Sequence, residues 1–402
     1  MSFNGVSIIG AGLSGLALAL ALHKQSIPCT IYEARQGSLD IGGAIMLSPN
    51  ALRVLDSLGI YQTIKPLGFE FKSLYYYADK PLDTYEFGDN QKYGYDGLRI
   101  YRREMIDALV SAVKDRGISI EYCKKFIAVT SETETEVTWD FDDGTTGRAS
   151  CLVGADGIHS RVRKYLYPNL EPYFTNAVGV TAAIPRIQVE EGSYQMPITI
   201  MNPKYGAFVM APQLPDGSEL LIGKQKRAAE LDRQGWSELL SNKQWCIDFL
   251  QEGSEHYPDI VKSAVNNIPL EKVNLWPFYV VPKLETWASK YSRVVILGDA
   301  AHAIPPSAGQ GINQAFEDIY TYALVLAKCQ QDNLALGLKT WQQGRQERVD
   351  RVMELNKQID ARRMPNHAAD APSDLDTKPF DMEWLYSPDF DKMAAGWLEA
   401  IA

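Results

Sequence analysis

Cysteine is scarce in this sequence. Five occur among 402 residues, and no two of them form a CxxC pair. A disulfide framework or a zinc site shows as clustered cysteines, so we expect neither, and no metal site. The simplest interpretation is reduced thiols in a cytoplasmic protein, with a single reactive cysteine as the alternative. The five are Cys29, Cys123, Cys151, Cys246 and Cys329.

The chain also lacks an excess of positive charge. It has 40 Lys and Arg against 50 Asp and Glu, a formal net charge of −10. This balance argues against nucleic acid or an anionic membrane surface as the main partner. It does not restrict a small-molecule substrate, because a local pocket can carry either sign.

Long hydrophobic runs are absent as well. The nearest candidate, residues 6–22, is interrupted by glycines, and no Lys or Arg precedes it. It is therefore neither a signal peptide nor a membrane span, and we expect a soluble protein. What is present is an ordinary globular composition, 46% hydrophobic and 22% charged. Such a chain supports a sizeable core divided over two or three subdomains.

The N-terminus has the pattern of a βαβ unit. Residues 6–9 and 29–32 are short apolar runs typical of buried parallel strands, and residues 13–23 predict the helix between them. The first turn reads GAGLSG, a GxGxxG motif. Its glycines permit a tight turn, a close approach to a pyrophosphate and close helix–strand packing. The expected cofactor contacts in this turn are Gly10, Gly12, Leu13, Ser14 and Gly15.

An acidic residue ends the second strand of this unit. The Glu33 carboxylate can accept hydrogen bonds from both hydroxyls of a ribose, and it disfavours NADP because a 2′-phosphate would meet it. Arg35 is a candidate for an adenine or phosphate contact, or else a surface arginine. From these residues alone NAD and FAD are equal candidates, and a glycine-rich turn of another α/β fold is the alternative.

Further signals outline the rest of the chain. Helices are predicted at 49–58, 104–114, 311–328 and about 337–362, and strands at 98–101, 151–154 and 293–297. Asp142-Asp143-Gly144 predicts a hairpin between 136–141 and 145–149. Between 173 and 278 strand-like runs dominate, at 198–201, 207–210 and 220–223, with one helical segment at 236–250.

These signals predict an α/β fold with an α+β insert. A Rossmann-like cofactor domain is expected from residues 1–172 and 279–330, with an inserted mixed β-sheet substrate domain at 173–278. Residues 331–402 are expected to form C-terminal helices and a tail, in which Trp384 to Trp397 either caps the cofactor domain or meets a partner.

Two more motifs follow buried strands. Residues 154–163 read GADGIHSRVR, and residues 298–313 read GDAAHAIPPSAGQGIN. With these three motifs in this order, the chain resembles the single-component (class A) flavoprotein aromatic hydroxylases, from about residue 5 to residue 330. Salicylate-hydroxylase-like enzymes, tetracycline-inactivating monooxygenases and enzymes of secondary metabolism belong to that family. The resemblance implies FAD rather than NAD as the bound cofactor.

The resemblance implies roles for the matching residues. Asp299 should bond a ribityl hydroxyl of FAD, and Asp156 should lie near the pyrophosphate. Arg102 matches an FAD-contacting arginine, with Arg103 as the adjacent alternative. The loop that follows Gly42 should pass the isoalloxazine, and a second loop with the start of its helix should face the flavin ring. These contacts are expected from Gly43, Ala44, Pro306, Gly309, Gly311, Ile312 and Asn313.

Structural interpretations stand beside these roles. Asp156 is also a candidate helix N-cap, and His302 is more typical of a packed structural histidine than of a base. Arg53 is a weaker FAD candidate that is equally suited to a helix surface. In the run Tyr75-Tyr76-Tyr77, alternation along a strand places part of the run in the core.

The resemblance also implies an activity. NAD(P)H and O2 would be used to hydroxylate, or epoxidise, an aromatic or polycyclic molecule through a flavin hydroperoxide, in a monomer or homodimer. No catalytic base is identified. An FAD-dependent oxidase or reductase and a non-enzymatic dinucleotide-binding protein are the alternatives. A halogenase is disfavoured, because its WxWxIP motif is missing and the nearest text is LWPF at 275–278.

The substrate pocket is the least determined part. The strand expected near residue 181 lacks the arginine that many relatives carry, which leaves carboxylate recognition in doubt, and alternation lets only some of the candidates face the flavin. The candidates are Thr181, Phe208, Met210 and Lys224, with Gln225 beside them.

Replacing Glu33 tests the first motif. Glu33→Arg removes the acceptor for the ribose hydroxyls, so the dissociation constant of FAD should rise by about tenfold or more. Titration of the protein with FAD, followed by flavin fluorescence, measures it. An unchanged constant would show that Glu33 points elsewhere.

Overall fold

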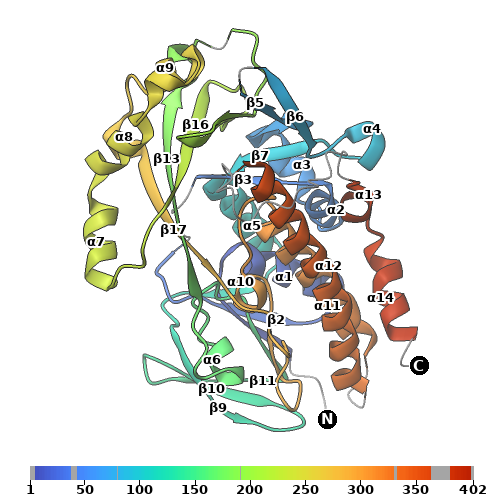
Figure 1. Ribbon diagram of the computed structural model, residues 1–402. Coiled ribbons are helices and arrows are strands. Elements are labelled where there is room, and N and C mark those ends of the chain that lie inside the picture. Colours follow the sequence, from blue (N-terminus) through green and yellow to red (C-terminus); the bar gives the residue numbers. More distant parts are fainter. Residues whose placement is uncertain are drawn as a thin grey trace.

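The protein is described by a computed structural model that covers residues 5–37, 43–78, 80–190, 192–329, 333–363 and 381–399. A cofactor-type α/β region and a large twisted sheet lie one above the other, with α11, α12 and α14 along one side (Figure 1). The predicted fold class, α/β with a mixed sheet, is confirmed. None of the helices in these ranges has the length and apolar character needed to cross a membrane.

A five-stranded parallel sheet forms the centre of the α/β region. The strands predicted at 6–9, 29–32 and 151–154 are all present, and the first and third of them are fully buried, as parallel strands covered on both faces require. The edge strand at 119–121 is short and largely exposed. Helices α1 and α5 pack against each other, and α1 also packs on α11. In order across the sheet the strands are β18 (Val294–Ile296), β12 (Cys151–Gly154), β1 (Val6–Ile9), β2 (Cys29–Tyr32) and β8 (Ser119–Glu121). The helices named here are α1 (Leu13–Lys24), α5 (Arg102–Asp115) and α11 (Gly311–Lys328).

Two small antiparallel sheets extend this region. The predicted hairpin is confirmed, with Gly144 at a positive φ of 81° in its turn. It belongs to the order β11 (Thr146–Ala149), β10 (Val137–Phe141), β9 (Phe126–Glu132). The second sheet has the order β3 (Ala44–Leu47), β7 (Gly97–Tyr101), β4 (Gly68–Phe71).

The large sheet has seven strands and takes them from two separate stretches of the chain. The strands predicted at 198–201, 207–210 and 220–223 are present, but β14 also pairs in parallel with β5. The predicted domain boundaries imply a sheet confined to residues 173–278, but the sheet also includes β5 and β6. Sequence patterns did not predict this, because pairing between distant segments leaves no local signal. Its order is β17 (Val273–Val280), β13 (Tyr173–Pro185), β16 (Glu219–Arg227), β15 (Gly206–Pro212), β14 (Ile198–Asn202), β5 (Ser73–Tyr77) and β6 (Pro81–Glu86).

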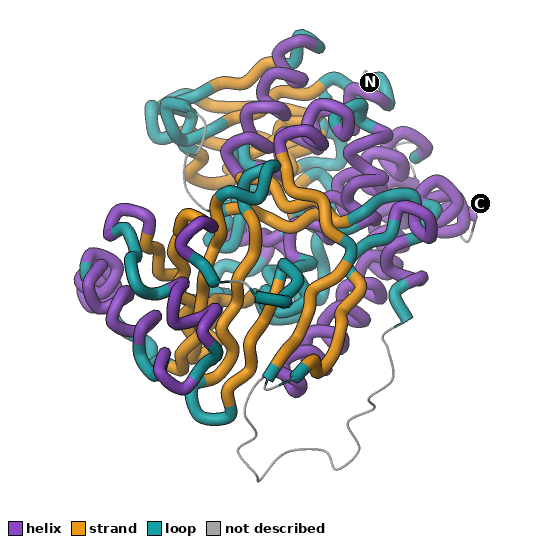
Figure 2. The backbone as a smooth tube through the Cα atoms, turned by 90° about the horizontal axis from the view of Figure 1, so that it is seen from above, coloured by secondary structure: helices purple, strands orange, loops and turns teal. Residues whose placement is uncertain are grey.

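A layer of helices covers one face of the large sheet, which we call the outer face (Figure 2). On the opposite face, Tyr76 and Tyr85 pack against Val352 and Leu355 of a C-terminal helix. A hydrophobic core between them contains Val180, Phe208 and Ile222 together with residues of α8 and α9. The single helix predicted at 236–250 is two helices, because Asn242 ends the first and caps the second. They are α7 (Arg233–Ser241) and α8 (Lys243–Gln251), followed by α9 (Asp259–Ala264).

The C-terminal helices pack on the cofactor region. Helix α14 contacts α11 and α12, and the Trp397 ring lies where a side chain on Gly344 would have to go. The segment from Trp384 to Trp397 thus covers this region, one of the two roles predicted for it. Remaining helices are α2 (Pro49–Ser57), α3 (Tyr61–Ile64), α4 (Asn90–Tyr93), α6 (Arg163–Leu166), α10 (Asp299–His302), α12 (Leu334–Arg363), α13 (Glu383–Tyr386) and α14 (Phe390–Glu399).

Candidate functional site

The three glycine-containing motifs meet at one edge of the parallel sheet. A Cβ on Gly10 (φ 107°) would lie 2.6 Å from the carbonyl oxygen of Ala155, so the first and second motifs touch. A Cβ on Gly298 (φ 58°) would lie 3.2 Å from Ser14 Oγ, so the third motif touches the start of α1. All three follow the carboxyl ends of parallel strands, the edge at which such sheets bind ligands.

The first turn is shaped to admit an anion. A Cβ on Gly15 would lie 1.9 Å from the Gly10 carbonyl oxygen, which explains the need for glycine in this helix–strand contact. A Cβ on Gly12 would meet nothing within 4 Å, and no side chain caps α1. The free N–H groups of the first turn of α1 therefore face open space, which fits a pyrophosphate. In the same turn Leu13 is buried and Ser14 half-buried.

Glu33 lies beside this turn at the end of β2. Its two carboxylate oxygens accept the N–H groups of Ala11 and Arg35, each at 2.9 Å. The Arg35 side chain is exposed and lies 3.5 Å from the same carboxylate. The position fits a ribose contact from the remaining lone pairs of Glu33, and both residues remain predicted cofactor contacts.

Asp156 stabilises its own loop. Its carboxylate accepts the Ser160 hydroxyl at 2.5 Å and the N–H groups of Arg161 and Val162 at 2.7 and 3.2 Å. The four-residue helix α6 begins only at Arg163, so Asp156 caps the turn before the helix rather than the helix itself. Burial raises the pKa of this carboxyl above its ordinary value, against the effect of these hydrogen bonds. Its cofactor contact remains a prediction.

Asp299 and Arg102 approach each other from different elements. Burial raises the pKa of Asp299, and its electrostatic interactions with His302 and Arg102 oppose that rise. The Asp299 side chain is nevertheless exposed, so water reaches it from one side while protein surrounds the others. Arg102 Nε is buried without a partner, whereas Arg103 is exposed and pairs with Asp107. The partly exposed carboxylate of Asp299 and the unpartnered Nε of Arg102 fit a contact with a polar cofactor. Of the two arginines, Arg102 is therefore the better candidate for this contact.

The loop before α11 is held by Asn313. Its side chain donates to the carbonyl oxygens of Met46 and Gly309 and accepts the Ser48 N–H at 3.0 Å. These bonds occupy the side-chain amide and attach this loop to β3, and a cofactor contact of Asn313 remains a prediction. A Cβ on Gly311 would meet nothing within 4 Å, and no side chain caps α11. The free N–H groups at the start of α11 therefore face open space.

The other loop candidates surround this opening. Gly309 has a φ of 64°, Pro306 is exposed, and Gly311 and Ile312 are half-buried. Gly43 and Ala44 are also half-buried, and the Arg102 N–H donates to the Gly43 carbonyl at 3.3 Å. Gly42 lies outside the described residues. Arg53 donates to the Tyr93 carbonyl at 2.8 Å, which gives it a structural role on α2.

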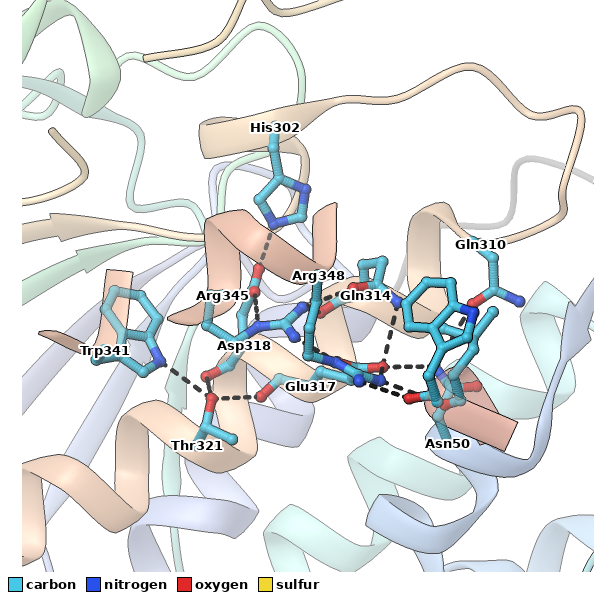
Figure 3. A network of polar contacts seen from close by, with 12 residues as sticks. Asn50, His302, Gln310, Gln314, Glu317, Asp318, Thr321, Trp341, Arg345 and Arg348 are labelled. Atoms are coloured by element: carbon cyan, nitrogen blue, oxygen red, sulfur yellow. Dashed lines mark hydrogen bonds and ion pairs between the residues drawn. The ribbon is translucent and has the colours of Figure 1, made fainter. Parts of the chain in front are cut away.

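Helices α11 and α12 are joined by a buried cluster of charges, which we call the α11–α12 cluster (Figure 3). Arg345 Nε lies 2.8 Å from Asp318 Oδ1, and Arg348 Nε lies 2.6 Å from Glu317 Oε2. Burial alone would raise the pKa of both carboxyl groups, but the arginines, with His302 beside Asp318, outweigh it and hold both pKa values below the ordinary range. The cluster is fully paired and therefore ionised.

The α11–α12 cluster reaches the third motif and the start of α2. Asp318 Oδ2 accepts the Gly298 N–H at 2.9 Å and lies 2.5 Å from His302 Nε2, which makes His302 a structural residue. Glu317 Oε1 accepts the Asn50 amide at 2.7 Å, at the start of α2. Sequence reasoning missed this cluster. Two adjacent acids within a long apolar helix, followed by arginines three residues apart, were the available signal.

The structure separates the four substrate-pocket candidates by sheet face. Phe208 and Met210 lie in the outer-face core, and Lys224 donates to the carbonyl oxygens of Phe249 and Glu252 of the outer helical layer. These three predictions are wrong, because alternation turns their side chains away from the cofactor region. Thr181 is on the opposite, inner face, where its Cγ2 would lie 3.1 Å from a Cβ on Gly223. It remains a candidate.

Comparison with known proteins agrees with this arrangement. A family model described as FAD binding domain matches residues 4–356. Among curated proteins, the chain is 26% identical to a 3-amino-4-hydroxybenzoate 2-monooxygenase of Streptomyces cremeus, covering 95% of this chain and 94% of the relative. It is 25% identical to a salicylate hydroxylase of Pseudomonas putida, covering 98% and 95% of the two chains.

A solved structure shares the whole fold. The crystal structure of CtdE in complex with FAD and a substrate superposes with a TM-score of 0.80 at 20% identity, covering 99% of this chain and 98% of that one. At this identity the likeness concerns the fold.

Asp299→Ala tests the assignment of the third motif. Loss of a charged acceptor should weaken FAD binding by about tenfold or more, seen in fluorescence titration and in the yellow colour of the purified protein. Asp259→Ala, at an exposed position on α9, is the matched control and should bind FAD normally. Full retention of affinity by the Asp299 variant would contradict the assigned role.

Arg345→Met tests the α11–α12 cluster. The variant leaves Glu317 and Asp318 short of a buried partner, so the free energy of unfolding should fall by about 3–5 kcal/mol. Denaturant titration measures the change. Lys357→Met, on the exposed side of α12, is the control and should change stability by no more than about 0.5 kcal/mol. Equal stability of the two variants would refute the importance of the cluster.

Proposed function

This chain belongs to the FAD binding domain family, and we propose that, as an FAD-dependent monooxygenase, it adds one oxygen atom from O2 to an aromatic or polycyclic small molecule at the expense of NAD(P)H. Support comes from the curated relatives, which are named for monooxygenase and hydroxylase activities on aromatic compounds. The observation that carries the proposal is the convergence of the three motifs around the open positions at Gly12 and Gly311.

The residues around these openings fit FAD. The N-terminus of α1 would bind the pyrophosphate, Glu33 the ribose, and Asp299 the ribityl chain. The bound flavin supplies the redox chemistry, which is acceptance of a hydride from NAD(P)H and activation of O2. The uncapped N–H groups of α11 would stabilise negative charge on the flavin ring.

The inner face of the large sheet would bind the substrate ring. Leu221 Cδ1 and Gln213 Oε1 lie 3.8 and 3.6 Å from the position of a Cβ on Gly43, so this face adjoins the predicted flavin loop. Thr181 lies on the same face, one strand away. A wall with apolar side chains excludes water from the reacting atoms, and a few polar groups orient the substrate.

We also propose a cytoplasmic location. It is supported by five unpaired cysteines, of which Cys151 and Cys246 are buried. Burial raises the pKa of both thiols, so they are unreactive, as expected of structural cysteines in a reducing compartment.

A turnover screen tests the oxygenase activity. FAD-loaded protein is mixed with NADH or NADPH and a panel of aromatic and polycyclic compounds, and products are examined by mass spectrometry. Substrate-stimulated oxidation of the nicotinamide with a product heavier by one oxygen atom is the expected result. Rapid oxidation with hydrogen peroxide as the only product for every compound would favour the oxidase or reductase alternative. The same protein freed of FAD and assayed without added FAD is the negative control.

A further inference from the structure

Arg99 is a buried arginine without a counterion. Its residue is only 4% exposed, at the middle of β7. Its Nε has no hydrogen-bond partner, and its one side-chain contact is a long one, 3.5 Å from Nη2 to the amide oxygen of Gln213. Within the described ranges, no carboxylate lies close enough to Arg99 to form an ion pair. A guanidinium therefore stands in the interior with most of its donors unused.

Other buried arginines have closer partners, since Arg163 donates to the carbonyl oxygens of Ala300 and Ile158 at 2.9 and 2.6 Å. Burial lowers the pKa of Arg99 to about 10, so the side chain is still charged at neutral pH. Arg345, which is equally buried, forms ion pairs with both Glu317 and Asp318. Buried charges are generally paired, because an unpaired one loses its hydration without compensation. The unsatisfied donors of Arg99 point to a missing anionic partner.

Arg99 lies between the predicted flavin loops. Across the small sheet it is the pairing partner of Met46, whose Cε would lie 3.8 Å from a Cβ on Gly309. Its contact Gln213 also accepts the Ala44 N–H at 3.4 Å and adjoins Gly43. The guanidinium thus occupies the junction of the small sheet, the flavin-loop segments and the inner face of the large sheet, where the substrate ring is proposed to bind.

Gln213 is oriented by a neighbouring cluster. Its Nε2 donates to the Tyr101 hydroxyl at 2.8 Å and to Glu219 Oε1 at 3.3 Å. The amide oxygen must therefore face Arg99 and Ala44. Glu219 is itself engaged with Tyr101 and lies 3.6 Å from Lys272, so it is not available to neutralise Arg99. Gln213 holds the guanidinium in place without cancelling its charge.

We propose that Arg99 is a specificity-determining residue whose guanidinium binds a carboxylate group of the aromatic substrate, with Gln213 as its positioning residue. The inference rests on the proposed function for the identity of the site. A planar guanidinium matches a carboxylate with two parallel hydrogen bonds. Strand β13 lacks the arginine that many relatives carry there. In this chain the positive charge comes from Arg99 on β7, on the other side of the proposed substrate site. Substrates with an aromatic acid group are then favoured over their neutral analogues.

Equilibrium binding tests this inference without turnover. Two matched probe pairs, benzoate with benzamide and salicylate with salicylamide, are titrated into the FAD-loaded protein at neutral pH, and binding is followed by the change in flavin absorbance. The wild-type chain should bind each acid more tightly than its amide. Arg99→Gln should weaken binding of the acids by about tenfold to hundredfold and leave the amides nearly unchanged. Arg99→Lys should retain part of the preference, because lysine keeps the positive charge but cannot donate two parallel hydrogen bonds to a carboxylate.

Arg116→Gln is the matched control. Arg116 follows α5 and donates only to backbone carbonyl oxygens of Ala112 and Leu58, so its loss should not change the preference for acids. FAD affinity and thermal unfolding are measured for all variants to establish that they fold.

Three results would overturn the inference. They are a wild-type protein without preference for the acids, an unchanged preference in Arg99→Gln, and a loss of FAD affinity in Arg99→Gln alone, which would assign the guanidinium to the cofactor. The proposed function fails independently. A protein that binds acids through Arg99 but oxygenates no compound would retain this inference and lose the monooxygenase assignment.

Discussion

The pairing of Glu317 and Asp318 with Arg345 and Arg348 is the interaction on which the cofactor region depends. Four charges cannot remain in the interior unless each is satisfied, so this cluster accepts only one relative position of α11 and α12. The same carboxylates accept the Gly298 N–H and the Asn50 amide. The loop that carries Asp299 and the start of α2 are therefore positioned by one pair of acids on one helix.

This arrangement separates structural from functional polar groups. His302, Asn313 and Asp156 occupy family motifs, yet their side chains are engaged in bonds that hold loops in place. Arg102 and Arg99 retain buried donors without partners. Buried nitrogens without partners also occur at Arg53, Arg163 and His302, so the missing partner is not by itself a sign of a ligand. Arg99 and Arg102 also adjoin the predicted flavin loops, where a ligand would complete their hydrogen bonding.

The large sheet borders the proposed substrate site, and its two faces differ in what covers them. The outer face is closed by α8 and α9 over an apolar core that includes Phe208 and Met210. The inner face presents Thr181, Leu221 and the end of β15 with Gln213 toward the β3 segment. The outer face stabilises the fold, and only the part of the inner face beside Thr181 and Leu221 is proposed to bind a substrate, because α12 packs on the β5–β6 end of that face.

The sequence alone determined the local elements and the cofactor. Strand periodicity and glycine spacing are local properties, so β1, α1, β2 and the hairpin around Gly144 were predicted correctly. The family resemblance carried by three ordered motifs then predicted FAD. The tertiary structure alone decided what depends on contacts between distant segments. It showed that β5 joins β14, that Lys224 faces the outer helices, and that Glu317 meets Arg348. It also left Arg99 unpaired beside the flavin loops. A side chain's partner is set by three-dimensional packing, and residue spacing along the chain does not contain that information.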